Sequence, residues 1–453
     1  MAVPGAKSQA RRGWEGQSLP PSLAEAAPAV GGSANGVAAW EGGAAAAPAR
    51  RSASSASAGK GETVLLTGAT GFLGMKILAD LLEHTDVRVL ALVRAADDRE
   101  ASARIAHKLE MVLGSRRGFA ARVRAIRGDV TLPDLGLGRR RSYVAERTQT
   151  IIHSAATVAF DTDIVATRAI NVEGTRNMLR FAELCEERGG LRRLAHVSTA
   201  YVAGAHSGIF SEDDLCVGQR FRNAYERSKF ESERLIAAWR DRLPITVLRP
   251  SIVVGERATG WTVAFNVLYW PLRAFANGAY AIIPTRAQAP VDIVPVDYVS
   301  AGVVHLAMLP EAEGATFHLT AAPHTTTAGE IAELASSFFE RPPPRFVEPA
   351  IYKHALHPLL TRVIPDRRTR RALKRSELFF PYFNAAVRFD NRRARVALKP
   401  AGIEPAPLRD YFDALMRFAI AADWGRRELA RPQPGTFVRA RARGRARRRR
   451  ARA

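Results

Sequence analysis

Short apolar runs rich in valine, isoleucine and leucine alternate with amphipathic stretches between about residues 62 and 320. The apolar runs predict buried parallel strands, and apolar residues spaced three and four apart predict the helices that connect them. The predicted strands span residues 64–66, 87–93, 123–126, 150–153, 193–201, 245–254, 291–298 and 317–320. The predicted helices span residues 75–82, 100–113, 166–184, 225–240, 327–340 and 411–422. This alternation predicts an α/β fold built on a Rossmann-type doubly wound parallel sheet.

The N-terminal stretch differs from this core. Residues 1–60 are rich in Ala, Gly, Ser and Pro and show no sustained period, so we expect them to be disordered. A transit peptide is the functional alternative, but the acidic side chains of Glu15, Glu25 and Glu41 argue against it.

The chain has 67 lysines and arginines against 44 acidic residues, a formal net charge of +23. Nine of the arginines lie within residues 439–453, where they could bind nucleic acid or anionic lipid by neutralising phosphates. A block of like charges more often stays solvated, so we expect a disordered arginine-rich tail over residues 431–453 and no nucleic-acid partner. The remaining excess of positive charge is scattered along the chain and favours anionic ligands.

The two cysteines, Cys185 and Cys216, exclude a disulfide scaffold and fit a reducing compartment. The first residues do not resemble a secretory signal, and the longest apolar stretch, residues 261–272, is too short to span a bilayer. We therefore expect a cytoplasmic protein with at most a peripheral membrane contact.

Three glycines interrupt the chain between the first predicted strand and helix, in Thr67-Gly-Ala-Thr-Gly-Phe-Leu-Gly74. In a nucleotide-binding βα unit such glycines make a tight turn, let the backbone approach a pyrophosphate, and let helix and strand pack closely. The helix N-terminus adds free N–H groups and a positive dipole end. Glycines at such a turn are a weak signal alone, but the strand before and the helix after them favour a dinucleotide site.

Polar or small residues follow the next predicted strands, at the edge where α/β sheets bind ligands. Arg94 could hold the 2′-phosphate of NADP or be an ordinary exposed arginine. Asp129, in Gly128-Asp129-Val130, could accept a hydrogen bond from an adenine amino group or end a turn. Ser154-Ala155-Ala156 offers small side chains against which a cofactor could lie.

Two hydroxyls, Ser198 and Thr199, end the fifth predicted strand, and Tyr225-Glu-Arg-Ser-Lys229 opens the next predicted helix. Residues four apart share a helix face, so the phenol and the ammonium can point into one cleft. A nearby ammonium lowers the pKa of a phenol, which predicts that Tyr225 is a usable acid at neutral pH. The pair alone is a common surface feature, but after a glycine loop and a hydroxyl-tipped strand it predicts a catalytic site.

Two further features of the sequence allow more than one interpretation. His153 ends the fourth strand and could do chemistry, but no partner is evident in the sequence, so we expect a packed, hydrogen-bonded histidine. Residues 261–283 are apolar and aromatic. They could pack as a second layer, line a pocket for an apolar substrate, or touch a membrane surface. Their rings are Trp261, Phe265, Tyr269, Trp270, Phe275 and Tyr280.

Together these motifs resemble the extended short-chain dehydrogenase/reductases over about residues 63–320. The motifs that carry the resemblance are Thr67-Gly-x-x-Gly-x-x-Gly74, Gly128-Asp129, Asn171, the Ser/Thr-tipped strand, Tyr225-x-x-x-Lys229 and Arg249-Pro250. Within the family, residues 152–158 and 196–201 are similar to the branch that reduces acyl thioesters. That branch comprises fatty acyl-CoA reductases ("male sterility" proteins) and the thioester-reductase domains of carboxylic acid reductases and peptide synthetases. Residues 249–253 and Phe389-Asp390-Asn391 also resemble fatty acyl-CoA reductases.

The resemblance implies an NADPH-dependent reductase of acyl thioesters, carried by coenzyme A or by an acyl-carrier protein, with an aldehyde or an alcohol as product. Thr199 and Tyr225 would hydrogen-bond the substrate carbonyl, and Tyr225 would protonate the oxyanion. Lys229 would hold the nicotinamide ribose and keep the phenol acidic, and Asn171 would brace the site. No metal is expected. The expected cofactor contacts are Gly68, Thr70, Gly71, Phe72, Leu73, Gly74, Arg94, Asp129, Val130, Ser154, Ala155, Ala156, Tyr225, Lys229, Pro250 and Ile252.

We expect the cofactor domain over residues 61–325, with substrate-side insertions at about 256–290, and a smaller substrate-binding C-terminal subdomain over residues 326–430. Other extended members, namely a sugar-nucleotide epimerase or dehydratase or a hydroxysteroid-type dehydrogenase, are the enzyme alternatives. A cofactor-sensing protein without chemistry is the alternative outside the enzymes. The oligomeric state is left open.

Overall fold

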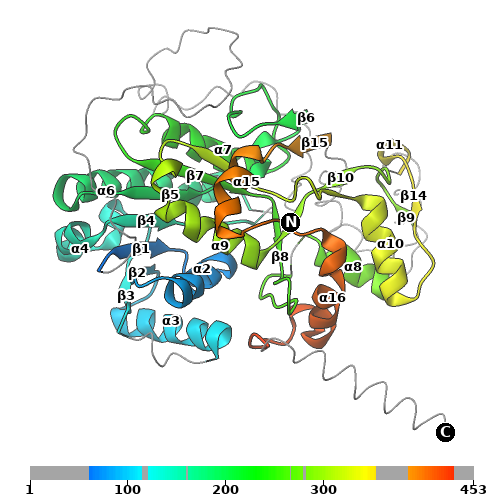
Figure 1. Cartoon of the computed structure of the whole chain (residues 1–453), viewed down its shortest axis with the longest axis horizontal. Helices are drawn as coiled ribbons and strands as arrows, with labels where there is room; N and C mark the ends of the chain where they lie inside the picture. The colour runs from blue at the N-terminus through cyan, green and yellow to red at the C-terminus, as the bar shows by residue number, and fades with distance from the viewer. Residues whose placement is uncertain are drawn as a thin grey trace, which may run out of the picture. The chain divides into compact units, whose positions relative to one another are not determined.

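The computed structural model has a sheet of seven parallel strands at its centre (Figure 1), in the order β12-β7-β5-β4-β1-β2-β3. The strands are β1 (Thr63–Thr67), β2 (Arg88–Val93), β3 (Val123–Arg127), β4 (Thr150–His153), β5 (Arg193–Val197), β7 (Ile245–Pro250) and β12 (Thr316–Leu319). The strand order reverses between β1 and β4, which is where doubly wound sheets bind ligands. The predicted fold class is confirmed.

The structure describes residues 61–114, 121–159, 162–265, 267–278, 282–352 and 386–432. All of these belong to one compact unit, Ser57–Ala453. The predictions for residues 1–60, for the ring of Tyr280 and for the arginine-rich tail beyond residue 432 lie outside the described residues.

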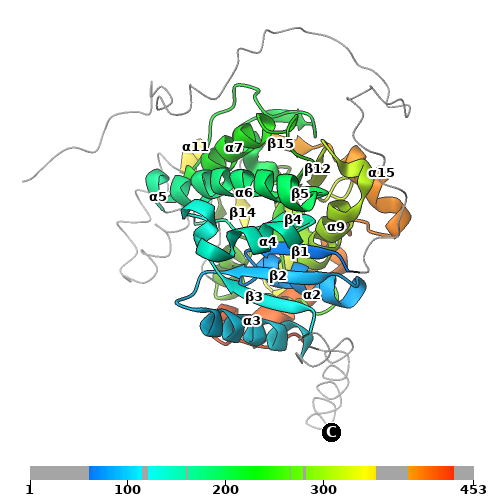
Figure 2. The ribbon, with the colours of Figure 1, turned by 90° about the vertical axis from the view of Figure 1, so that its left-hand side faces the viewer.

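Helices cover both faces of the sheet. Helix α2 packs against α3 and α9, and α6 packs against α4 and α7. Figure 2 shows α6 and α7 on one side of the sheet and α2 and α3 on the other. The side chains of Val64 and Leu66 on β1 are fully buried in the core that includes Ile77 and Leu81 of α2. The helices are α2 (Phe72–His84), α3 (Asp98–Leu113), α4 (Arg141–Arg147), α6 (Gly174–Gly189), α7 (Ala224–Ala237) and α9 (Val296–Met308).

A second core lies beside the carboxyl ends of the strands. It joins side chains from residues 200–210, 252–275 and 387–419, which include Leu272, Phe389 and Leu415. Helix α15 (Arg392–Leu398) packs in the first core through Ala394 and Leu398, and α11 (Pro349–Ile351) is a short separate helix. The second core takes side chains from helices α8 (Tyr269–Ala276), α10 (Ala328–Phe339) and α16 (Phe412–Ala421). Its two-stranded pairs are β8 (Ile252–Val254) with β11 (Ile293–Pro295), β10 (Pro290–Val291) with β13 (Thr326–Thr327), β9 (Ile282–Ile283) with β14 (Arg345–Phe346), and β6 (Ser207–Phe210) with β15 (Ala386–Phe389).

Short helical turns link these elements. The 3-10 turns are Pro133–Gly136, Gly138–Arg140, Ala200–Ala203, Pro310–Ala312, Lys399–Ala401, Leu408–Asp410 and Asp423–Gly425. The predicted helix at 166–184 is three pieces instead of one: α5 (Ile164–Arg168), a π-helical turn (Ala169–Glu173) and α6. Gly174 starts α6, and an added Cβ there would lie 3.1 Å from Val130 Cγ2, so the glycine permits close packing of α6 on the loop after β3.

Three predicted strands were too long. The strand at 193–201 ends at Val197, because Thr199 caps a 3-10 turn by accepting a hydrogen bond from the Tyr201 amide at 3.2 Å. The strand at 245–254 divides at Ser251, where the chain leaves the main sheet after β7 and continues as β8, which pairs with β11. The strand at 291–298 ends at Pro295, and the helix α9 that follows was missed. Because α9 is buried on most of its sides, its valines lack the amphipathic period that identifies surface helices.

The aromatic stretch after β8 mostly serves packing. Trp261, Tyr269 and Phe275 are buried, whereas Trp270 is 45% exposed. In the part of the chain that the structure describes, no helix is both long enough and apolar enough to cross a bilayer. The predicted membrane contact stays a prediction.

Candidate functional site

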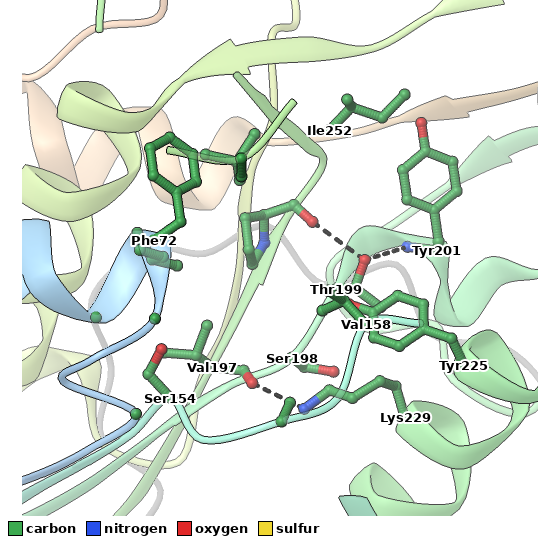
Figure 3. Close-up of a pocket in the computed structure, with 18 of the residues that line it drawn as sticks. Phe72, Ser154, Val158, Val197, Ser198, Thr199, Tyr201, Tyr225, Lys229 and Ile252 are labelled. Carbon is green, nitrogen blue, oxygen red and sulfur yellow. Dashed lines mark hydrogen bonds between the residues drawn. The ribbon is translucent and has the colours of Figure 1, made fainter. Parts of the chain in front are cut away.

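A pocket opens at the carboxyl edge of the sheet, where β1, β4, β5 and β7 end near the start of α7 (Figure 3). It brings together most of the residues that the sequence singled out, from segments that lie far apart along the chain. The lining residues are Gly68, Gly71, Phe72, Leu73, Gly74, Ser154, Ala156, Val158, Val197, Ser198, Thr199, Tyr201, Tyr225, Lys229, Pro250, Ser251, Ile252, Val253, Ala264 and Val267.

The glycine loop leaves no room for side chains. Gly68 has a φ of +75°, and a Cβ there would meet the backbone of Ser154 and Ala155 at 2.8 Å. A Cβ on Gly74 would lie 2.0 Å from the Gly68 carbonyl oxygen. These distances explain why glycine is required at both positions, since real Cβ atoms essentially never come that close.

The loop runs directly into the first turn of α2. Gly71 occupies the N-cap position, and it provides no side-chain cap for the first amides of this thirteen-residue helix. Four N–H groups at a helix start have no acceptor within the helix, and the helix dipole adds partial positive charge there. The bare helix start and the glycine backbone together fit a dinucleotide pyrophosphate.

The loop after β4 forms the opposite wall. The Thr67 hydroxyl accepts a hydrogen bond from the Ala155 amide at 3.1 Å, which fixes this loop against the end of β1. Ser154 and Ala156 line the pocket, while Ala155 points its amide at Thr67 and does not line it. Small residues here let the two loops approach each other across the sheet.

Thr199 and Tyr225 meet in this pocket. The Thr199 side chain is 3% exposed, donates to the Pro250 carbonyl at 3.4 Å, and shares a side-chain hydrogen bond with the Tyr225 phenol. Asn223 caps α7 by accepting a hydrogen bond from the Glu226 amide at 2.9 Å, so the phenol projects from the first turn of a well-anchored helix. The predicted convergence of the two side chains is therefore seen in the structure.

Lys229 lies one helical turn further along and is 2% exposed. Its ammonium donates to the Val197 carbonyl at 2.9 Å and lies 3.5 Å from Nε2 of His196. Burial lowers the pKa of Lys229 to about 8, and the carboxylate of Glu233 only partly opposes this. The group is thus charged at neutral pH but close to its titration point.

The predicted lowering of the Tyr225 pKa is wrong. Burial raises the pKa of Tyr225 to about 12, and the Thr199 hydrogen bond offsets only part of that rise. The sequence argument considered the Lys229 charge alone and did not include the loss of water around the phenol. Tyr225 therefore stays protonated throughout the physiological range and keeps a proton to donate.

Asn171 braces the wall of the pocket without lining it. Its Oδ1 accepts from the Thr157 amide at 2.9 Å, and its Nδ2 donates to the Thr157 carbonyl at 3.1 Å and to Ser228 Oγ at 2.9 Å. It lies in the π-helical turn that precedes α6. Asn171 consequently ties the loop after β4 to helix α7, as a bracing residue would.

Besides Ala155, four predicted cofactor contacts lie outside this pocket. Arg94 is exposed after β2, and Thr70 lies in the loop before α2. Asp129 Oδ1 accepts from both the amide and the hydroxyl of Thr131 at 2.9 Å, the bonds of a turn residue. Val130 packs near Gly174. Their contacts with a cofactor stay predictions.

Several pocket residues were not singled out as contacts. Val158 and Tyr201 follow the motif residues closely in the chain, so their place after a strand end was the available signal. Ala264 and Val267 come from the aromatic stretch, which contributes to the pocket through small aliphatic side chains. His196 was part of a quoted motif, but its contact with Lys229 depends on strand register that sequence does not give.

The family model described as male sterility protein, an NAD-binding family, matches residues 66–303, and the chain belongs to this family. The chain is 35% identical over 256 residues to isonitrile lipopeptide synthase of Streptomyces coeruleorubidus. It is 29% identical over 276 residues to the fatty acyl-CoA reductase wat of Drosophila melanogaster. These matches cover 55% and 52% of this chain but 17% and 52% of the relatives, so the chain spans only part of their length.

Among solved structures, the terminal R domain from the myxalamid PKS-NRPS biosynthetic pathway superposes with a TM-score of 0.69 and 28% identity, over 83% of this chain and 94% of that one. A UDP-glucuronic acid 4-epimerase from Bacillus cereus, at TM-score 0.56 and 18% identity over 80% of this chain and 98% of that one, shares the fold alone. The predicted extended short-chain dehydrogenase/reductase of the male sterility branch, a nicotinamide-dependent oxidoreductase, is confirmed.

Proposed function

We propose that this member of the male sterility family is an NADPH-dependent reductase of acyl thioesters, with Tyr225 as general acid. One observation carries the proposal: Thr199, Tyr225 and Lys229 line the same pocket as the glycine loop. A bound dihydronicotinamide would supply the hydride. The glycine loop and the start of α2 would hold its pyrophosphate, and Lys229 its ribose.

The two hydroxyls supply hydrogen bonds where negative charge develops. Hydride addition to a thioester carbonyl leaves an oxyanion, and Thr199 and Tyr225 lie side by side to donate to that oxygen. Because the pKa of Tyr225 is raised to about 12, the phenol is protonated when the oxyanion forms and can give up its proton. Collapse of the resulting thiohemiacetal breaks the C–S bond, releases the thiol and leaves an aldehyde. A second reduction would give the alcohol.

The rest of the pocket suits an acyl chain. Val158, Ile252 and Val267 contribute aliphatic side chains beside the Thr199–Tyr225 pair. The names of the relatives include a lipopeptide synthase and a fatty acyl-CoA reductase. We propose a fatty acyl chain on coenzyme A or on an acyl-carrier protein as the substrate. The sugar-nucleotide alternative is supported only by shared fold.

The test is an assay of the purified chain with NADPH and a panel of acyl thioesters of different length, on coenzyme A and on carrier protein. The proposal predicts one thiol released per NADPH oxidised if the product is an aldehyde, or one thiol per two NADPH if it is an alcohol, with the product identified by mass spectrometry. Tyr225→Phe should slow turnover by about 10²- to 10⁴-fold, the usual contribution of a general acid. Tyr143→Phe, the same change at an exposed site on α4, is the control. Absence of NADPH oxidation across the panel would exclude the proposed function.

A further inference from the structure

Three polar side chains lie in a row across the middle strands of the sheet, beneath the pocket. Thr67, His153 and His196 are register partners across β1, β4 and β5, so they share one face of the sheet. All three are almost completely buried. Thr67 Oγ1 lies 2.9 Å from Nδ1 of His153, and the two imidazole rings have centroids 5.4 Å apart.

Lys229 reaches down from α7 to the end of this row. Its ammonium carries three N–H groups, one of which donates to the Val197 carbonyl at 2.9 Å. A second points toward Nε2 of His196 at 3.5 Å. An ammonium can only donate, so Nε2 must be the acceptor and the His196 proton must be on Nδ1. The third N–H group is left for the pocket, which Lys229 lines.

The acidic side chain whose charge opposes the lowering of the Lys229 pKa is already engaged. Glu233 lies one turn further along α7, and its carboxylate accepts three hydrogen bonds from the buried guanidinium of Arg249, at 3.1, 3.1 and 2.7 Å. The other titratable groups around the ammonium are His196 and His153 below it and Tyr225 on its own helix. Both imidazoles are kept neutral by burial, which lowers the pKa of His153 to about 3 and that of His196 well below its ordinary value.

We propose that His196 is a positioning residue for Lys229: its neutral imidazole accepts a hydrogen bond from the ammonium and aims the remaining N–H toward the pocket. A carboxylate in this place would pair with the ammonium and cancel the charge that the ribose and the phenol need. An aliphatic side chain would leave a buried N–H without an acceptor. A neutral acceptor avoids both effects at Lys229, and the buried N–H without an acceptor is then Nδ1–H of His196. This role rests on the proposed function, but it concerns a contact that exists in the free protein.

The test compares His196→Gln with His196→Asn. A glutamine amide reaches about as far as Nε2 and keeps an acceptor for Lys229, whereas the asparagine amide reaches only to the Nδ1 position. Both substitutes are polar and smaller than or similar to histidine, so a difference between them reports the acceptor. His153→Gln, which changes the other imidazole of the row, is the matched control for effects on packing. Thermal unfolding of each variant checks that it is folded.

The first measurement needs no turnover. The chain has only eight lysines, so ¹³C-lysine NMR of the cofactor-free protein can follow each side chain with pH, and a Lys229→Met variant assigns the signal. Lys229 is expected to titrate near pH 8 in the wild type and in His196→Gln. In His196→Asn the midpoint should fall by about one pH unit, the size of one charge-assisted hydrogen bond.

The second measurement is the pH profile of turnover. In His196→Asn the alkaline limb of kcat should move down with the Lys229 midpoint, so that kcat falls about twofold at pH 7 and about tenfold at pH 9, and KM for the thioester should stay unchanged. An unchanged Lys229 midpoint in His196→Asn, or an equal shift in His196→Gln, would overturn the positioning role. If the wild type reduces no thioester, the proposed function fails, and the NMR comparison still decides the contact.

Discussion

At the level of single side chains, burial decides how the pair Tyr225 and Lys229 behaves. Burial disfavours the charged form of each group: it raises the pKa of the phenol and lowers the pKa of the ammonium. The phenol therefore remains an acid with a proton to give, and the ammonium is the group that titrates first as the pH rises. The lysine, rather than the tyrosine, should limit activity on the alkaline side.

This ordering predicts a single alkaline limb. If the charged form of Lys229 is the active one, kcat is maximal well below the Lys229 pKa of about 8 and declines as the pH rises through that value. Tyr225, with a pKa near 12, contributes no loss until much higher pH. Measuring kcat between pH 6 and about 10.5 checks this, and Lys229→Arg, whose charge persists throughout, should remove the limb. A limb that stays in Lys229→Arg would assign it to another group.

Arg94 tests the choice between NADPH and NADH. If its exposed guanidinium binds the 2′-phosphate, Arg94→Ala should reduce the preference for NADPH over NADH about 10- to 100-fold in kcat/KM. Arg88 is exposed at the other end of the same strand, so Arg88→Ala is the matched control. A preference that is unchanged in Arg94→Ala would show that the arginine is only a solvated strand end.

At the level of elements, the glycine loop and α2 form the most predictable part of the site. Their spacing reflects contacts within one βα unit, so residues 63–74 alone specified the turn, the bare helix start and the close approach to the next strand. The convergence of Thr199 and Tyr225 was also predictable, because strand ends in a parallel sheet share one edge. His196 could not be found in this way, because its contact needs the register of β4 and β5 and the depth of α7.

The same distinction explains the errors in the elements. Helix α9 was missed because burial on most sides removes the amphipathic period, and valine-rich sequence then resembles a strand. The strand at 245–254 was drawn too long because the apolar run continues through the point where β8 leaves the sheet and joins β11. In both cases the local pattern was real, but a tertiary contact decided the outcome.

Gly74→Ala tests the packing of loop on helix. The added Cβ would lie 2.0 Å from the Gly68 carbonyl oxygen, so the loop must shift. Overpacking of this kind costs about 1–3 kcal/mol, which would weaken NADPH binding about 10- to 100-fold if the shift falls on the cofactor. Gly329→Ala, near the start of α10 and remote from the pocket, is the control. Fluorescence titration measures the NADPH affinity of both variants. Equal affinities of Gly74→Ala and Gly329→Ala would show that the loop tolerates the methyl group.

At the level of the whole molecule, the C-terminal region supports the pocket through the second core. The ring of Phe389 on β15 packs edge-on against the ring of Tyr201, with 5.7 Å between the two ring centroids, and Tyr201 lines the pocket. Glu212 accepts from the amides of Arg393 and Ala394, at 2.7 and 3.0 Å, and so fixes the start of α15. The predicted C-terminal subdomain therefore shares contacts with the pocket wall, although its boundaries stay a prediction.

Phe389→Ala should show this support. Removal of a buried ring costs about 3–5 kcal/mol of unfolding free energy, and the loss should also loosen the Tyr201 wall and raise KM for the thioester. Val396→Ala, at a 61% exposed position on α15, should change neither quantity appreciably. Denaturant unfolding and steady-state kinetics measure the two effects. If Phe389→Ala is destabilised but its KM for the thioester is unaltered, the C-terminal region does not support the pocket.

The central claim is that the pocket formed by Thr199, Tyr225 and Lys229 delivers hydride to a thioester carbonyl with a proton from Tyr225. Deuterium transfer from C4-labelled NADPH to an acyl thioester tests this directly. The wild type should transfer one deuterium to the carbonyl carbon of the thioester, which becomes the aldehyde carbon. One thiol should be released for each aldehyde formed. Tyr225→Phe should bind NADPH equally well and transfer deuterium about 10²- to 10⁴-fold more slowly. Products without deuterium, or equal transfer by Tyr225→Phe, would contradict the mechanism.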